Sequence, residues 1–72
     1  MAQIKIRADV AGTVWKIEVA VGARVAEGDT IMLIESMKME IPVMAPRSCK
    51  LLRVLVREGD PVSEGQVVAE IE

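Results

Sequence analysis

The hydrophobic positions of this 72-residue chain fall in short runs rich in Val, Ile and Leu, which polar segments containing glycine separate. No window carries apolar residues at helical spacing between capping residues, so the pattern favours strands over helices. Several segments instead show the alternation of apolar and polar residues that is typical of half-buried strands. We therefore expect an all-β protein with strands at residues 4–7, 12–21, 30–36, 39–44, 49–58 and 67–72.

The alternation is interrupted once in each of the two longest predicted strands. In the first, Val14 breaks a pattern that would place Trp15 on the apolar face, and in the second Leu55 breaks the pattern. An extra apolar residue in an alternating run predicts a β-bulge or a strong local twist. We expect Trp15 to be a core or half-buried packing residue, and Met32 and Met44 to fill gaps in the core.

The chain consists of two similar halves. Residues 8–35 align with residues 45–72 without a gap at an offset of 37. Identical pairs include Ala8/Ala45, Gly22/Gly59, Val25/Val62, Glu27/Glu64, Gly28/Gly65, Ile34/Ile71 and Glu35/Glu72. Because glycine accepts the positive φ of tight turns, the recurring glycines indicate a duplicated turn framework. Each half is too small to bury a face alone, so we expect one domain, residues 1–72, built as a pseudo-twofold sandwich or flattened barrel.

Composition excludes several classes of partner and of chemistry. The net charge is −2 with acidic and basic residues interleaved, which predicts no nucleic-acid partner, and no apolar run is long enough to span a membrane. Without histidine, Ser-His and Cys-His nucleophile pairs and most zinc sites are impossible. A lone cysteine, Cys49, indicates a reducing, cytoplasmic setting. We expect a protein that is not itself an enzyme.

One lysine stands where the two halves join. The hexapeptide 35–40 reads ESMKME, and the strands predicted on either side leave Met37 and Lys38 as a two-residue hairpin turn. Met-Lys is a poor choice for such a turn, and local misfits are expected at functional sites. A type I turn would accept both residues, so the sequence leaves the question of strain open.

Lys38 is the candidate for chemical modification. A lysine at a hairpin tip projects into solvent, and the neighbouring Glu35 and Glu40 favour its charged form, so a separate enzyme would have to acylate it. Most exposed turn lysines have no such role. The duplication and the methionines on both sides favour one here. The other lysines, Lys5, Lys16 and Lys50, are expected to stay unmodified.

Residues 8–72 resemble the biotinyl domain of the biotin/lipoyl attachment family, in its compact form without a thumb insertion. The sequence Met37-Lys38-Met39, preceded by the small Ser36, carries the resemblance. Further family positions are occupied by Gly12, Gly22, Gly28, Gly59, Gly65 and Ala45-Pro46. The resemblance implies a flattened barrel of two four-stranded antiparallel sheets, with the modified lysine on a hairpin opposite the paired termini.

The resemblance also implies a function. Biotin would be attached to Lys38 by an amide bond that a biotin protein ligase makes, and it would shuttle a carboxyl group from a biotin carboxylase to a carboxyltransferase. Met37 and Met39 would be recognised by the ligase and by these carboxylase partners, for which adaptable methionines are suited. Glu35 would help the ligase to distinguish biotin from lipoate substrates.

Two other functions stay open at this point. A lipoyl carrier of an oxo-acid dehydrogenase or glycine cleavage complex would use the same scaffold, although lipoyl domains usually have Asp-Lys-Ala at the hairpin. An unmodified β-sandwich that only docks to a larger enzyme would need no lysine. Cys49 stands where the second half would carry the equivalent of Gly12, so it is either strained or a small buried residue. Met1, followed closely by a strand, suggests a free subunit.

Overall fold

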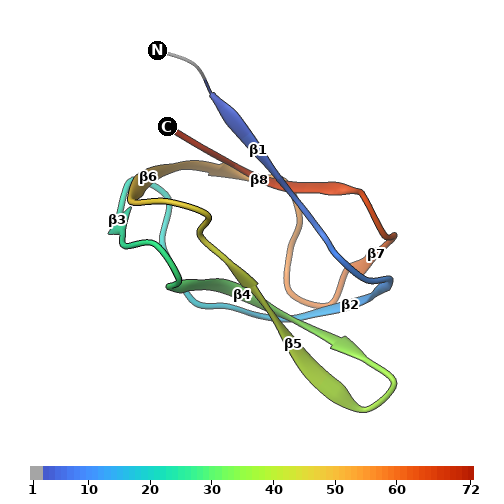
Figure 1. Cartoon of the computed structure of the whole chain (residues 1–72). Helices are drawn as coiled ribbons and strands as arrows, with labels where there is room; N and C mark the ends of the chain where they lie inside the picture. The colour runs from blue at the N-terminus through green and yellow to red at the C-terminus, as the bar shows by residue number, and fades with distance from the viewer. Residues whose placement is uncertain (1–2) are drawn as a thin grey trace.

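The computed structural model describes residues 3–72, which form strands joined by turns (Figure 1). Residues 1 and 2, which belong to the predicted domain and to the expectation about Met1, lie outside the described residues. The all-β prediction is confirmed. The strands are β1 (Ile4–Arg7), β2 (Gly12–Ile17), β3 (Arg24–Val25), β4 (Thr30–Ser36), β5 (Met39–Met44), β6 (Cys49–Val54), β7 (Pro61–Val62) and β8 (Val67–Ile71).

The strand predictions differ from the structure mainly at their C-terminal ends. The strand predicted at 12–21 ends at Ile17, the one at 49–58 ends at Val54, and the last ends one residue early. Ile17 donates its backbone N–H to the Glu58 carboxylate at 2.9 Å, and Glu18, just after β2, still donates its N–H to the Ile31 carbonyl of β4 at 2.9 Å. The apolar residues that follow pack against the core without continuing the ladder. Strands β3 and β7 were not predicted, because each consists of two residues and is too short to show an alternation of apolar and polar positions.

The eight strands form two antiparallel sheets, as the resemblance implied. The first sheet has the order β1-β8-β6-β3 and the second has the order β5-β4-β2-β7. At the offset of 37, β2, β3 and β4 correspond to β6, β7 and β8, and β1 corresponds to the second part of β5. Exchanging the two halves therefore converts one strand order into the other. Each sheet contains strands of both halves, which explains why neither half is a folding unit.

Hydrogen bonds between the halves repeat the same symmetry. Gly22 donates its backbone N–H to the Leu51 carbonyl at 2.7 Å, and the equivalent Gly59 donates to the Val14 carbonyl at 2.7 Å. The φ angles of these glycines are +93° and +94°, which residues with a side chain rarely adopt. The predicted turn framework is confirmed. The other turn glycines with positive φ are Gly28 and Gly65.

The core lies between the two sheets and contains no buried charged side chain among the described residues. Its largest fully buried members are Ile31, Met32, Ile34, Leu51, Ile71, Val14 and Val68. Met32 fills the core as predicted, whereas the prediction for Met44 was wrong. Met44 is 53% exposed because its neighbours Val43 and Ala45 take the buried positions, so that its own side chain faces outward.

A bulge decides the position of Trp15. The pairing of β2 with β4 shifts between Val14 and Lys16, close to where the broken alternation predicted a bulge. Val14 takes the core position with 1% exposure, and Trp15 is left 48% exposed, so Trp15 has the half-buried position of the two that were expected for it. In the second half the equivalent bulge lies between Leu51 and Arg53 rather than at Leu55.

The equivalent positions Gly12 and Cys49 obey different constraints. A Cβ on Gly12 would overlap the Glu35 carbonyl oxygen and lie 2.9 Å from the Ile34 Cγ2, so only glycine fits beneath the end of β4. Cys49 has no positive φ and is a buried residue of the core. Burial raises the pKa of the Cys49 thiol, and the positive charge of Arg47 opposes this only partly. The strained alternative for Cys49 is thus ruled out.

The molecule is elongated, with extents of 35 × 17 × 17 Å. Figure 1 shows the start of β1 and the end of β8 at one end of the sandwich and the β4–β5 hairpin projecting from the other. In the part of the chain that the structure describes, no helix could cross a membrane.

Candidate functional site at the hairpin tip

Strands β4 and β5 pair as far as Ser36 and Met39, so Met37 and Lys38 alone form the turn. Their φ angles are +53° and +65°. A two-residue hairpin with positive φ at both central positions is a type I′ turn, for which Asn-Gly is the preferred sequence. The undemanding type I turn, which the sequence left open, is not the one that forms.

Positive φ at two residues with side chains stores strain at this site. Each residue in the left-handed region costs roughly 1–2 kcal/mol unless it is glycine, asparagine or aspartate. The pairing of β4 with β5 over its whole length holds the turn in this geometry. Backbone strain of this kind is concentrated at functional sites, where it fixes the direction of a side chain.

Replacing Met37 with asparagine is expected to stabilise the protein by roughly 0.5–1 kcal/mol, because asparagine tolerates positive φ. The measurement is the free energy of unfolding from urea denaturation. The control is Met39→Asn, since Met39 is also exposed but occupies a strand position. Equal effects of the two substitutions would contradict a strained turn.

The side chains around the tip are accessible. Met37 is 91% exposed and Met39 is 63% exposed, while Glu35 and Lys38 are also exposed. Within residues 3–72 the ion pairs are Lys16 with Glu18 and Arg53 with Glu70, so neither includes Lys38. The Lys38 ammonium is therefore free of any partner in the described structure, and an enzyme can reach it.

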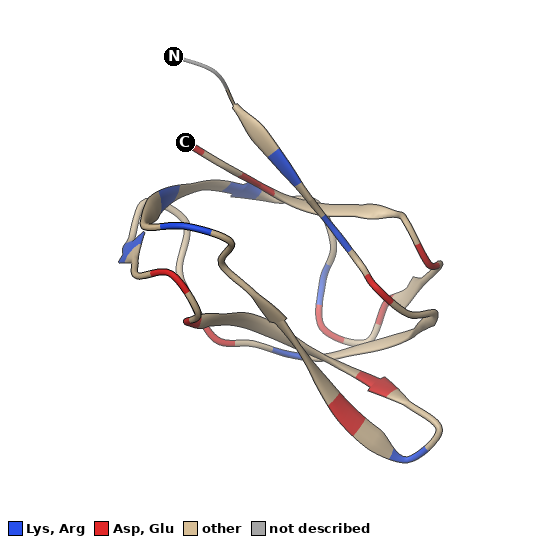
Figure 2. Ribbon diagram, viewed as in Figure 1, with Lys and Arg blue, Asp and Glu red and all other residues tan. Residues whose placement is uncertain are grey.

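Two carboxylates lie directly behind the tip. Glu35 of β4 and Glu40 of β5 are paired across the hairpin. Figure 2 shows acidic positions on both strands just before the basic tip. Like charges directly opposite one another destabilise a strand pair. The two carboxylates place a concentrated negative charge on the hairpin directly behind its tip.

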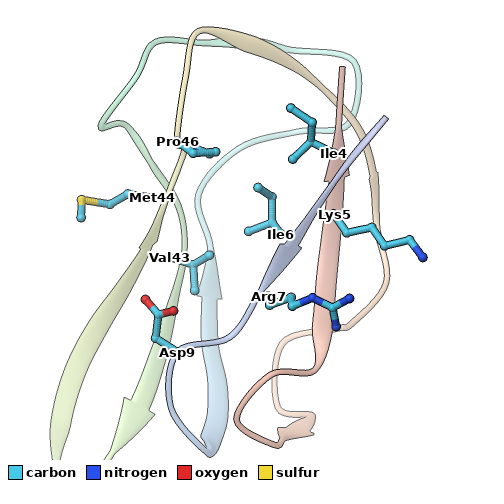
Figure 3. A pocket seen from close by; sticks show the side chains of 8 residues that line it. All are labelled: Ile4, Lys5, Ile6, Arg7, Asp9, Val43, Met44 and Pro46. Atoms are coloured by element: carbon cyan, nitrogen blue, oxygen red, sulfur yellow. The ribbon is translucent and has the colours of Figure 1, made fainter. Parts of the chain in front are cut away.

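A surface groove of the described structure lies elsewhere. It has a volume of about 380 Å³ and lies between β1 and the segment from Val43 to Pro46 (Figure 3). Figure 3 shows Ile4, Ile6 and Val43 directed into it, and no residue of the hairpin tip lines it. No group of three or more His, Cys, Asp or Glu residues that could hold a metal occurs among residues 3–72. The tip is thus an exposed projection and not a pocket.

The residues at the tip fit a group that is held by a covalent bond. Lys38 offers a primary amine, which forms an amide with a carboxylic acid, and nothing in the described structure covers it. The turn that contains Lys38 joins β4 and β5, and the β4–β5 hairpin projects from the end of the sandwich opposite the start of β1 (Figure 1). A group attached there has open space on every side except that of the hairpin.

Comparison with known proteins agrees with this geometry. The family model described as "Biotin-requiring enzyme" matches residues 5–71. The chain belongs to the biotin/lipoyl attachment family. The resemblance read from the Met37-Lys38-Met39 motif is thereby confirmed, although the role of each residue at the tip stays a prediction.

Three relatives show how much of this biotin/lipoyl attachment domain is shared. A biotin/lipoyl attachment protein of Bacillus subtilis (strain 168) is 44% identical over 62 residues, which are 86% of this chain and 85% of that protein. A biotinylated protein TB7.3 homolog of Mycobacterium leprae is 38% identical over 66 residues, 92% of this chain and 93% of that protein. The Kluyveromyces lactis urea carboxylase structure has a TM-score of 0.95 and 36% identity, covering 100% of this chain and 6% of that chain.

The structure brings all four predicted site residues together on the hairpin. Met37 and Lys38 form the turn, Met39 begins β5, and Glu35 lies in β4 near its end. Two features of the site were not recognised in the sequence. Glu40 was placed beside Lys38, but its pairing with Glu35 across the hairpin was not foreseen, and Gly12 was not seen to support the end of β4. The pairing that a two-residue turn imposes was the available signal for Glu40.

Proposed function

We propose that this domain is a biotin carboxyl carrier and that biotin is attached to Lys38. The observation that carries the proposal is the exposed Lys38 on a type I′ turn, in a chain of the biotin/lipoyl attachment family. The domain itself catalyses no reaction. It serves a biotin-dependent carboxylase as a carrier subunit or domain.

The residues of the hairpin have different roles in the proposed carrier. The turn fixes the Cα of Lys38 and directs its amine away from the sandwich, so the side chain and not the domain supplies the motion. Met37 and Met39 present flexible apolar surface to the proteins that handle the tip. Biotin, when attached, supplies a ring nitrogen that takes up and gives away a carboxyl group. Tethering keeps its effective concentration high at two active sites in turn.

The proposed partners follow from this cycle. A biotin protein ligase makes the amide bond at Lys38, with Glu35 contributing to its choice of substrate. A biotin carboxylase loads the carboxyl group, and a carboxyltransferase passes it to an acceptor. Relatives that are whole carboxylases are much longer than this chain, which covers 6% of the urea carboxylase and 6% of a Bacillus subtilis pyruvate carboxylase.

Incubation with two ligases tests the choice of cofactor. We expect biotin protein ligase with ATP and biotin to add one biotinyl group per chain, and lipoate ligase with ATP and lipoate to add nothing. Intact-mass measurement reads both reactions. A lipoyl adduct without a biotinyl adduct would assign the domain to the lipoyl carriers instead. No adduct in either reaction would favour an unmodified docking module.

A further inference from the structure

The outer face of the second sheet carries an apolar row next to the hairpin. The bulge in β2 makes Trp15 and Lys16 together oppose Leu33 of β4, which pairs in turn with Pro42 of β5. Both neighbours of Leu33 along β4 are fully buried, so Leu33 itself faces outward. We call Trp15, Leu33 and Pro42 the apolar row. Trp15, the one aromatic residue of the chain, is its most prominent member with 48% of its surface exposed.

The internal symmetry shows that the fold does not require apolar residues at two of the three positions of this row. At the offset of 37, the first sheet has Glu70 in place of Leu33 and Lys5 in place of Pro42, while Trp15 corresponds to the apolar Leu52. There Glu70 also pairs with Arg53, whose Nε lies 2.7 Å from its carboxylate. The same backbone arrangement thus carries two charged residues on one face and two apolar residues on the other. Packing within the domain does not explain the difference at these two positions.

A second row lies between the apolar row and the tip. Thr13, Glu35 and Glu40 pair across β2, β4 and β5 and are all exposed. Two residues along a strand separate the rows, which is a distance of about 7 Å. Within residues 3–72 neither carboxylate is in a recorded ion pair. A cationic side chain from another protein, placed between the carboxylates, would relieve their repulsion.

We propose that the apolar row is the docking surface for the ligase that acylates Lys38. That enzyme presents an apolar socket for the Trp15 indole and, about 7 Å away, an Arg or Lys that pairs with Glu35 and Glu40. This inference rests on the proposed function, because it names the partner of the same lysine.

The position of the row favours the ligase over the partners that act later. Acylation takes place at the Lys38 amine before any arm extends from it, so the enzyme must bring its own surface to the hairpin. An enzyme that reaches the tip along the second sheet contacts the acidic row and then the apolar row. Enzymes that act on the loaded arm can work at a greater distance from the domain. Exposed aromatic residues of this kind are frequent anchors at protein interfaces.

Substituting Trp15 with serine tests the docking surface, with Leu55→Ser as the matched control. Leu55 is 50% exposed and lies outside the apolar row, in the segment after β6. Initial rates of biotinylation are measured against the concentration of the domain at a fixed concentration of biotin protein ligase. We expect the KM of Trp15→Ser to rise roughly fivefold or more with kcat nearly unchanged, because only binding is lost. For Leu55→Ser we expect a KM within about twofold of the unsubstituted domain. Urea denaturation verifies that both variants are folded.

The proposed ion pairs of Glu35 and Glu40 with the ligase are tested separately, through the dependence of the KM on salt concentration. For the unsubstituted domain the KM should rise with salt concentration, and in the double variant E35Q/E40Q this dependence should be largely lost. A Trp15→Ser domain with the KM of the unsubstituted domain would overturn the docking surface. A variant that is biotinylated normally but carboxylated poorly would overturn the assignment to the ligase and give the face to the carboxylase. Failure of the proposed function is seen separately, as an unsubstituted domain that takes no biotin.

Discussion

Substitution of Lys38 by arginine is expected to abolish biotinylation completely. Arginine keeps the positive charge at the tip, but its guanidinium stays protonated and forms no amide in the ligase reaction. The measurement is an avidin blot of the variant expressed together with biotin protein ligase, supported by intact mass. Because the substitution is conservative and exposed, the free energy of unfolding from urea denaturation should remain within about 0.5 kcal/mol of that of the unsubstituted domain.

Lys16→Arg is the matched control for this experiment, since Lys16 is an exposed lysine on a strand of the same sheet. It should be biotinylated as fully as the unsubstituted domain. An avidin signal that survives Lys38→Arg would remove Lys38 from the site. A Lys38→Arg domain that still supports its carboxylase would instead favour a docking module that needs no modification.

Substitution of Gly12 by alanine should have the largest effect on stability. The added methyl group would overlap the Glu35 carbonyl oxygen, which belongs to the backbone and cannot move without shifting the end of β4. Overpacking of this kind costs typically 1–3 kcal/mol, and a 72-residue domain has roughly 4–11 kcal/mol in total. Urea denaturation should therefore show a large loss of stability. Biotinylation should slow as well, because β4 leads directly into the hairpin.

Thr13→Ala is the control for Gly12, because Thr13 is the next residue of β2 and its side chain is exposed. Its cost should stay near 0.5 kcal/mol. If both substitutions destabilised the protein equally, the close approach of β2 to β4 would not be what requires glycine at this position.

Much of the fold could be predicted from the sequence because the same pattern of turn glycines and apolar residues occurs in both halves. The offset of 37 aligned the turn glycines, and the structure shows them making equivalent hydrogen bonds, such as Gly22 to Leu51 and Gly59 to Val14. When the same local pattern occurs twice, the assignment of a strand or turn in one half is supported by the equivalent segment of the other half. The strand ends were less predictable, since apolar residues after Ile17 contact the core without belonging to a ladder.

Two large apolar residues lie outside the core for a related physical reason. Trp15 and Met44 are both about half exposed, which agrees with the half-buried alternative for Trp15 and contradicts the core position that was expected for Met44. For Trp15 the bulge supplies a second apolar residue, Val14, that occupies the one available core position. For Met44 the neighbours Val43 and Ala45 take the buried positions, so its side chain faces outward. Where apolar residues are adjacent, the sequence does not reveal which of them faces the core.

The position of the candidate site was predicted from the sequence, whereas the backbone strain in its turn was not. The Met37-Lys38-Met39 motif placed the lysine on a hairpin tip, and the structure has it there. The strain in the turn could not be predicted, because φ at Met37 and Lys38 depends on whether the hairpin closes as type I or type I′. The right-handed twist of the flanking strands selects the primed form.

Peptide mapping of the biotinylated domain tests the account most directly. The unsubstituted protein, with all its lysines present, is treated with biotin protein ligase, digested and sequenced by tandem mass spectrometry. We expect the biotinyl group on the peptide that contains Lys38 and on no other. Label at Lys5, Lys16 or Lys50 with Lys38 unmodified would contradict the role of the hairpin as the carrier of biotin.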